Sequence, residues 1–249
     1  MRDFLQNNFR FPARRASLNR AHPLLAGSHL GIAAVANVPG GMTDLNTGVI
    51  STNTNTLSPV NELGQCARGG NAVNSSTFLT WAGPTNPIAQ ITASCILKYT
   101  GTGTMWPLAL ANQTNTGIEI TTTTAVINWQ QAATNIFGNY VMKLGHCYFY
   151  LVSNRSDTMG GSGYSVIVDM TTGLVWTASN STSGLGQLPL LTLMNVLQQN
   201  DANTGGPNPV AAVHVSANFT TASLNATQQR MDLGTLLEAA SKPWSLWYA

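Results

Sequence analysis

Charged residues are scarce in this 249-residue chain. Asp, Glu, Lys and Arg together make up 8% of the sequence, whereas hydrophobic residues make up 43%. Disordered proteins are rich in charge and poor in apolar residues, so this composition excludes disorder as the state of the whole chain. A length near 250 residues suits one large β-type domain, and we expect one compact domain.

Long apolar runs and paired cysteines are also lacking. The apolar stretch near Leu30–Val38 is broken by Asn37 and is far shorter than the roughly 20 residues of a membrane-spanning helix. Met1–Asn8 lacks the apolar core of an export signal. The three cysteines have no C-x-x-C spacing, which predicts buried free thiols. We therefore expect no membrane span, no export signal and no cysteine-bound metal.

Motifs for catalysis are missing as well. Gly160–Tyr164 lacks the final glycine of a nucleophile elbow, and the Gly-Lys pair of a P-loop occurs nowhere. The four histidines have no metal-ligand spacing, and we interpret His146 and His214 as ordinary strand residues. The sequence thus predicts no catalytic, cofactor-binding or metal-binding residues, and no enzymatic activity.

The chain is rich in residues that favour strands and turns. Thr and Asn supply 30 and 24 positions, beside 23 Gly. Ile91–Tyr99 alternates as a half-buried strand does, whereas Cys147–Val152 is apolar on both faces, as in a central strand. Tyr164–Asp169 and Leu174–Ala178 flank a four-residue turn that ends in Gly173, which predicts a hairpin.

Helical periodicity is confined to the C-terminal part of the chain. Ser223 can cap a helical run that starts at Leu224, and Leu233, Leu236, Leu237 and Ala240 follow at helical spacing before Pro243. Many short strands with one short helix favour an all-β sandwich.

Arginine is concentrated at the N-terminus. One acidic residue opposes five arginines in the first twenty residues, for a net charge of +4, while the rest of the chain carries six basic and eight acidic residues, a net −2. We expect an extended basic arm over residues 1–24 and a sandwich domain over residues 25–249. Five arginines could neutralise only a few phosphates, and residues 25–249 are not basic, so we expect no nucleic-acid partner.

Two other interpretations of the arm are a solvated tail and an assembly arm that lies along a neighbouring subunit. We favour the assembly arm, because Arg and Phe are enriched at protein interfaces. The residues assigned to it are Arg10, Phe11, Arg14, Arg15 and Arg20.

Several phrases of the sequence resemble, in their order and spacing, the laminin-G-like, concanavalin A-like jelly-roll structural proteins of tailed bacteriophages. They are an opening phrase, two turn phrases, a strand phrase and a closing segment in two parts. These are Leu18–Gly27, Asp44–Gly48, Gly145–Tyr148, Val168–Gly173, Phe219–Gln229 and Leu236–Trp247. The resemblance implies a concanavalin A-like jelly-roll β-sandwich with an extended N-terminal arm and a short C-terminal helix.

The same resemblance implies a non-enzymatic virion structural protein. We expect a tail-associated or fibre component, anchored through its arm to other virion proteins of the capsid or tail. It would be present as a homo-oligomer or in multiple copies, with no nucleic-acid or membrane partner. The alternatives are a capsid decoration (cement) protein, or a lectin-like module that binds host-surface glycan.

Ligands implied by such sandwiches are sugars and calcium. The possible stacking platforms for a glycan are Trp81, Trp106, Trp129 and Tyr140, and Trp81 and Trp106 are the two that we assign as contacts. No cofactor is predicted, and calcium at Asp44, Asp157 or Asp169 is the alternative left open, because a hard cation takes oxygen ligands. Glycan hydrolases of this superfamily need closely spaced carboxylates, and the closest pair here, Asp232 and Glu238, is six residues apart.

Overall fold

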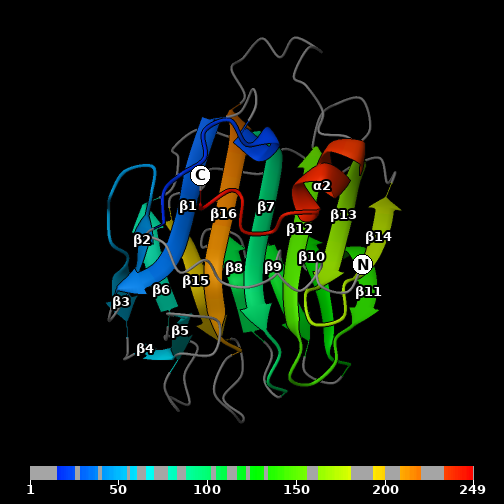
Figure 1. Cartoon of the computed structure of the whole chain (residues 1–249), viewed down its shortest axis with the longest axis horizontal. Coiled ribbons are helices and arrows are strands. Elements are labelled where there is room, and N and C mark those ends of the chain that lie inside the picture. Colours follow the sequence, from blue (N-terminus) through cyan, green and yellow to red (C-terminus); the bar gives the residue numbers. More distant parts are fainter. Residues whose placement is uncertain are drawn as a thin grey trace.

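The structure is a computed structural model. It describes fifteen segments of the chain: residues 16–25, 29–38, 41–54, 57–60, 66–69, 78–82, 88–101, 105–110, 117–121, 124–131, 134–155, 162–180, 193–199, 208–219 and 233–248. Two antiparallel sheets and a short C-terminal helix account for most of these residues (Figure 1). None of the helices in these segments is long and apolar enough to span a membrane.

The larger sheet has the strand order β14-β13-β12-β7-β16-β1-β2, and β5, which pairs with β4, joins it beside β16. Its strands are β1 (His29–Val38), β2 (Gly41–Asp44), β4 (Leu57–Val60), β5 (Cys66–Gly69), β7 (Ile88–Lys98), β12 (Cys147–Arg155), β13 (Ser162–Asp169), β14 (Leu174–Asn180) and β16 (Val210–Phe219). The central place of β12, between β7 and β13, confirms the interpretation of Cys147–Val152 as a central strand.

The smaller sheet has the strand order β11-β10-β9-β8-β15-β6-β3. Its strands are β3 (Thr52–Thr54), β6 (Phe78–Ala82), β8 (Met105–Leu110), β9 (Gly117–Thr121), β10 (Val126–Gln131), β11 (Thr134–Val141) and β15 (Leu193–Gln199). The helices are the 3-10 turn η1 (Pro23–Leu25) and α2 (Leu233–Ala240). The all-β sandwich is confirmed, and so is the helix over Leu233–Ala240, whereas the predicted start at Leu224 lies outside the described residues.

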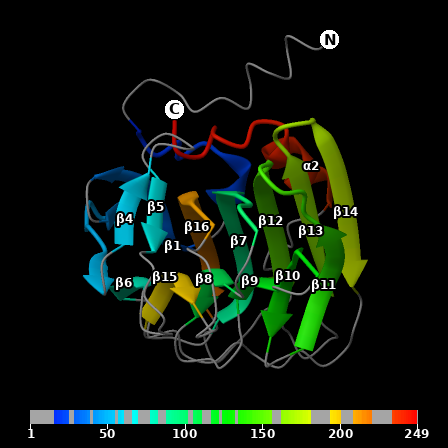
Figure 2. The same ribbon diagram turned by 90° about the horizontal axis from the view of Figure 1, so that it is seen from below.

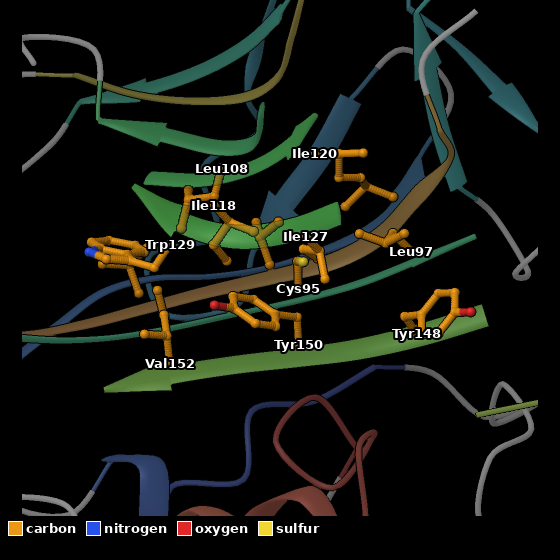
Figure 3. Close-up of a cluster of buried hydrophobic side chains, with 14 of the residues drawn as sticks. Cys95, Leu97, Leu108, Ile118, Ile120, Ile127, Trp129, Tyr148, Tyr150 and Val152 are labelled. Carbon is orange, nitrogen blue, oxygen red and sulfur yellow. The ribbon is translucent and has the colours of Figure 1, made fainter. Parts of the chain in front are cut away.

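The main core lies between the two sheets (Figure 3). Tyr148, Tyr150 and Val152 of β12 project toward Ile127 and Trp129 of β10. Aromatic rings carry the largest buried area per residue, so this layer supplies much of the apolar stabilisation. Cys95 is a buried free thiol, as predicted, and burial raises the pKa of this thiol, whereas Cys147 is only partly buried.

A second apolar cluster covers the outer face of the larger sheet. Leu24, Leu236 and Trp247 pack there against Ile96 of β7 and neighbouring strands. Figure 2 shows α2 and the C-terminal segment on the side of this sheet that faces away from the smaller sheet. The prediction that Ile91–Tyr99 is half-buried is therefore wrong: both faces of β7 are covered, and even Thr92 and Ser94 are buried.

The N-terminal side of the sandwich is tied to the C-terminal segment. We call residues 16–25 together with residues 244–248 the terminal clasp. The backbone N–H groups of Ser17 and Asn19 donate to the carbonyls of Trp247 and Leu246, each at 2.9 Å. Residues 1–15 of the predicted arm lie outside the described residues, whereas residues 16–24 belong to the clasp and are packed on the body.

Candidate functional site

Two turns of the larger sheet share one sequence pattern and one geometry. Asp44–Gly48 and Asp169–Gly173 both read D-x-x-T-G, and they lie at opposite edges of the sheet. In each turn the glycine N–H donates to the aspartate carbonyl at 2.7 Å, and the aspartate Oδ1 accepts from the N–H two residues later. The glycines have φ values of 75° and 78°, the left-handed region that favours glycine. The predicted hairpin around Gly173 is confirmed.

The second carboxylate oxygen distinguishes the two turns. Oδ2 of Asp44 accepts a hydrogen bond from the Thr47 hydroxyl at 2.7 Å. Oδ2 of Asp169 instead accepts from Nδ1 of His146 at 2.8 Å. Asp169 is 1% exposed and the His146 side chain is 23% exposed, so a buried carboxylate orients a partly exposed imidazole.

The segment that carries His146 is fixed by its own backbone. Tyr99 directly follows β7. Its backbone carbonyl accepts a hydrogen bond from Gly145 N–H at 2.7 Å, and its backbone N–H donates one to the His146 carbonyl at 2.9 Å. The His146 ring stacks on Tyr148, with 21° between the planes. With Nδ1 committed to Asp169, the neutral ring presents an acceptor at Nε2. Among the described residues, none forms a hydrogen bond with Nε2.

Aromatic side chains from both sheets meet beside this pair. Tyr140 of β11 lies 5.9 Å, between ring centroids, from both Tyr148 and Trp176 of β14. Tyr140 and Trp176 are partly exposed, while Tyr148 is buried. Burial raises the pKa of Tyr148, and burial followed by the nearby Asp169 carboxylate raises that of Tyr140, so both phenols stay protonated at neutral pH.

Strand register places the residues of β14 in the same cluster. Tyr148, Asp169 and Leu174 are directly opposite one another across β12, β13 and β14, so their side chains share one face. Trp176, two residues after Leu174, lies on that face as well, and β14 packs against β11 of the other sheet. We call this group the edge site; its members are Tyr140, His146, Asp169, Leu174 and Trp176.

Several exposed apolar side chains belong to the edge site or are close to its members in the sequence. Val141, Leu144, Leu174 and Val175 are four of the seven large apolar side chains that are exposed among the described residues. Val141 follows Tyr140 and Val175 precedes Trp176, so both valines lie on the opposite strand faces, and Leu174 is the exposed aliphatic member of the site. The composition of the edge site is thus aromatic and aliphatic, with one oriented imidazole.

A second polar pair lies on the smaller sheet. Glu119 and Asn128 are opposite each other on β9 and β10, on the face turned away from the main core. Within the described part of the chain, Glu119 Oε2 and both amide atoms of Asn128 have no hydrogen-bond partner. Burial raises the pKa of Glu119, and both side chains are withheld from solvent.

The residues proposed from sequence as ligand contacts fare differently. The predictions for Trp106 in β8 and Trp129 in β10 are wrong, because the two rings are buried and unavailable for stacking on a sugar, whereas Tyr140 is partly exposed and belongs to the edge site. Trp81 lies in β6, and its side chain is outside the described residues. Asp44 and Asp169 use their carboxylates to close turns, whereas Asp157 is outside the described residues. No group of three potential metal ligands occurs in the described segments.

The assembly-arm residues are largely beyond the described segments. Arg10, Phe11, Arg14 and Arg15 all lie outside them, and Arg20 is exposed on the terminal clasp. Sequence analysis missed the pairing of His146 with Asp169, because the two are 23 residues apart and His146 was interpreted as a strand residue. The D-x-x-T-G pattern is the same in both turns, so it does not indicate that one of the two aspartates has a histidine partner.

Comparison with known proteins reaches only the level of fold. No protein-family model matches the sequence. No curated protein matches it either. Among solved structures, one of botulinum neurotoxin type C, whose cell entry depends on interaction with two ganglioside molecules, matches with a TM-score of 0.54 at 10% identity, over 85% of this chain and 51% of that one.

Two further structures give similar results. The ligand-binding domain of botulinum neurotoxin serotype D, in complex with N-acetylneuraminic acid, has a TM-score of 0.51 at 9% identity, over 77% of this chain and 48% of that one. Lectin II from Ulex europaeus has a TM-score of 0.46 at 13% identity, over 77% of this chain and 100% of that one. The chain thus spans about half the length of the toxin structures. The predicted concanavalin A-like jelly-roll sandwich is confirmed.

Proposed function

We propose that the chain is a carbohydrate-binding module and that the edge site is where it binds sugar. The observation that carries the proposal is an imidazole oriented by a buried carboxylate, beside two partly exposed aromatic rings. Sugars offer apolar C–H faces to aromatic rings and hydroxyls to fixed polar groups. The sandwich fold shared with the ligand-binding domain of the toxin structures supports the same function.

Each member of the site has a distinct part in binding. Trp176 supplies the ring on which a sugar stacks, and Tyr140 holds that ring from the opposite sheet. Nε2 of His146 accepts a hydrogen bond from the sugar, because Nδ1 is engaged by Asp169. Asp169 is a positioning residue: it is buried and touches the sugar only through His146.

The experiment is a glycan array followed by titration calorimetry on the sugars that bind. We expect Trp176→Ala to weaken binding about tenfold or more, since stacking and its apolar contact are worth about 1.5 kcal/mol or more. Thr177→Ala is the matched control, because Thr177 is an exposed neighbour on the other face of β14. Absence of saturable sugar binding, or equal affinities for the two variants, would overturn the proposal.

The predicted place on a tailed-phage particle is a separate part of the proposal. It rests on the order of the sequence phrases and on the concentration of arginine near the N-terminus. A glycan-binding module suits a tail or fibre component, whose partners would be other virion proteins and whose target would be the host surface. Particle incorporation, argued with the arm below, is its test.

A further inference from the structure

Leu174 places an exposed aliphatic side chain beside the oriented imidazole. It is directly opposite Asp169 in the β13–β14 pairing, and directly opposite residues have side chains about 5 Å apart. Leu174 is 54% exposed, although it shares its face with the buried Tyr148 and with Trp176. The edge site therefore pairs a hydrogen-bond acceptor, Nε2 of His146, with an apolar surface next to it.

The matching turn at the other edge of the sheet has the aliphatic residue but not the imidazole. Val49 follows Gly48 as Leu174 follows Gly173, and it is 55% exposed. There the second oxygen of Asp44 is occupied by Thr47 of the same turn, so no ring nitrogen is presented. An exposed aliphatic residue after this turn is thus common to both edges, and its juxtaposition with an acceptor occurs at one.

The juxtaposition fits one substituent of sugars better than a hydroxyl group. A secondary amide offers an N–H donor, and the methyl of an acetyl group lies within a few bonds of it. A bare hydroxyl satisfies Nε2 but leaves Leu174 in contact with water. We propose that the edge site selects sugars that carry a 2-acetamido group, with the amide N–H donated to His146 Nε2 and the methyl packed on Leu174.

This inference rests on the proposed function and adds the class of sugar. Burial of the methyl and the retained hydrogen bond together favour the acetamido sugar over its 2-hydroxy counterpart by about tenfold. Trp176 carries the sugar ring in both cases, so the preference comes from Leu174 and His146. The preference is therefore separable from binding itself.

The test uses pairs of glycosides that differ only at carbon 2: N-acetylglucosamine and glucose, N-acetylgalactosamine and galactose, N-acetylmannosamine and mannose. We expect the acetamido member to bind about tenfold tighter in the pairs that bind. Equal or tighter binding of the hydroxyl member would overturn the inference and leave the carbohydrate site standing. Failure of all six sugars together with the wider array would overturn the carbohydrate site itself.

Variants assign the preference to its residue. Leu174→Thr removes the aliphatic side chain and introduces a β-branched residue that suits an exposed strand position. It should reduce affinity for the acetamido sugar more than affinity for the hydroxyl sugar. Val49→Thr is the matched control and should leave the preference unchanged. Thermal unfolding of both variants checks that the fold is intact, and a preference that survives in Leu174→Thr contradicts the assignment.

Discussion

Asp169 closes a turn and orients an imidazole, whereas Asp44 closes an equivalent turn without one. In Asp169→Asn the side-chain carbonyl can still accept from the turn amides, but the amide nitrogen must donate to Nδ1 of His146. The ring proton then moves to Nε2, which changes the group facing the sugar from an acceptor to a donor. We expect a loss of sugar affinity of about tenfold, measured by titration.

Asp44→Asn provides the control for this substitution. Both variants lose a charged acceptor in a turn, and each should lower the free energy of unfolding by about 1–2 kcal/mol in urea denaturation. Only Asp169→Asn should alter sugar binding. Unchanged affinity in Asp169→Asn would show that the imidazole does not contact the ligand through Nε2.

The sequence shows which residues could stack on a sugar, but it does not show which of them are exposed. Trp106 and Trp176 both lie in strands, yet the first is buried and the second is partly exposed. The difference arises because β14 is the last strand of the larger sheet and meets only the edge of the smaller one. Which strand ends a sheet depends on pairings between distant segments, and periodicity does not report them.

The elements themselves were more predictable. The hairpin of β13 and β14 follows from two β-rich runs around Gly173, and α2 follows from leucine spacing before Pro243. The half-buried prediction for β7 failed for a reason outside its own sequence: the terminal clasp and α2 cover the face that carries Ile96. Alternation within a strand gives its two faces, and only the tertiary fold decides how many are covered.

Two buried histidines, His22 of the terminal clasp and His214 of the larger sheet, are held neutral. Nδ1 of His22 accepts from Leu24 N–H at 3.2 Å, and its Nε2–H donates to the Ser245 hydroxyl at 2.9 Å. His214 of β16 lies between the hydroxyls of Ser94 and Ser216. Burial lowers the pKa of His22 to about 4, and burial followed by the charge on His22 lowers that of His214 to about 3.

These directions predict acid sensitivity of the clasp. Both folded-state pKa values lie below the unfolded-state value of about 6.5. The stability that depends on the two histidines being neutral is therefore fully present above pH 6.5 and is lost as the pH falls toward 4. Each histidine should add a slope of about 1.4 kcal/mol per pH unit in that window. Urea denaturation of wild type and His22→Gln at several pH values measures it: the variant should be less stable at pH 7.5 but show a flatter decline. An equal slope in both proteins would contradict the neutral His22.

For the whole molecule, the clasp divides the predicted basic arm into two parts. The described contacts of the clasp start at Ala16, and Leu24 is buried against α2 and the C-terminal segment. Four arginines and one aspartate lie in residues 1–15, where the net charge is +3. We therefore expect residues 1–15 to serve in anchoring and residues 16–24 to serve in folding.

Two truncations distinguish these roles. Removal of residues 1–15 should leave the free energy of unfolding and sugar binding unchanged, while removal of residues 1–24 should cost about 3–5 kcal/mol, because Leu24 and the clasp hydrogen bonds are lost. If the arm anchors the protein to a phage particle, the shorter truncation should abolish its incorporation, as measured by mass spectrometry of purified particles. Normal incorporation without residues 1–15 would exclude the arm as the anchor, and absence of the full-length chain from particles would exclude the virion role. The longer truncation alone cannot separate these cases, because a destabilised domain and a missing anchor both reduce incorporation, so the boundary at residue 15 carries the test.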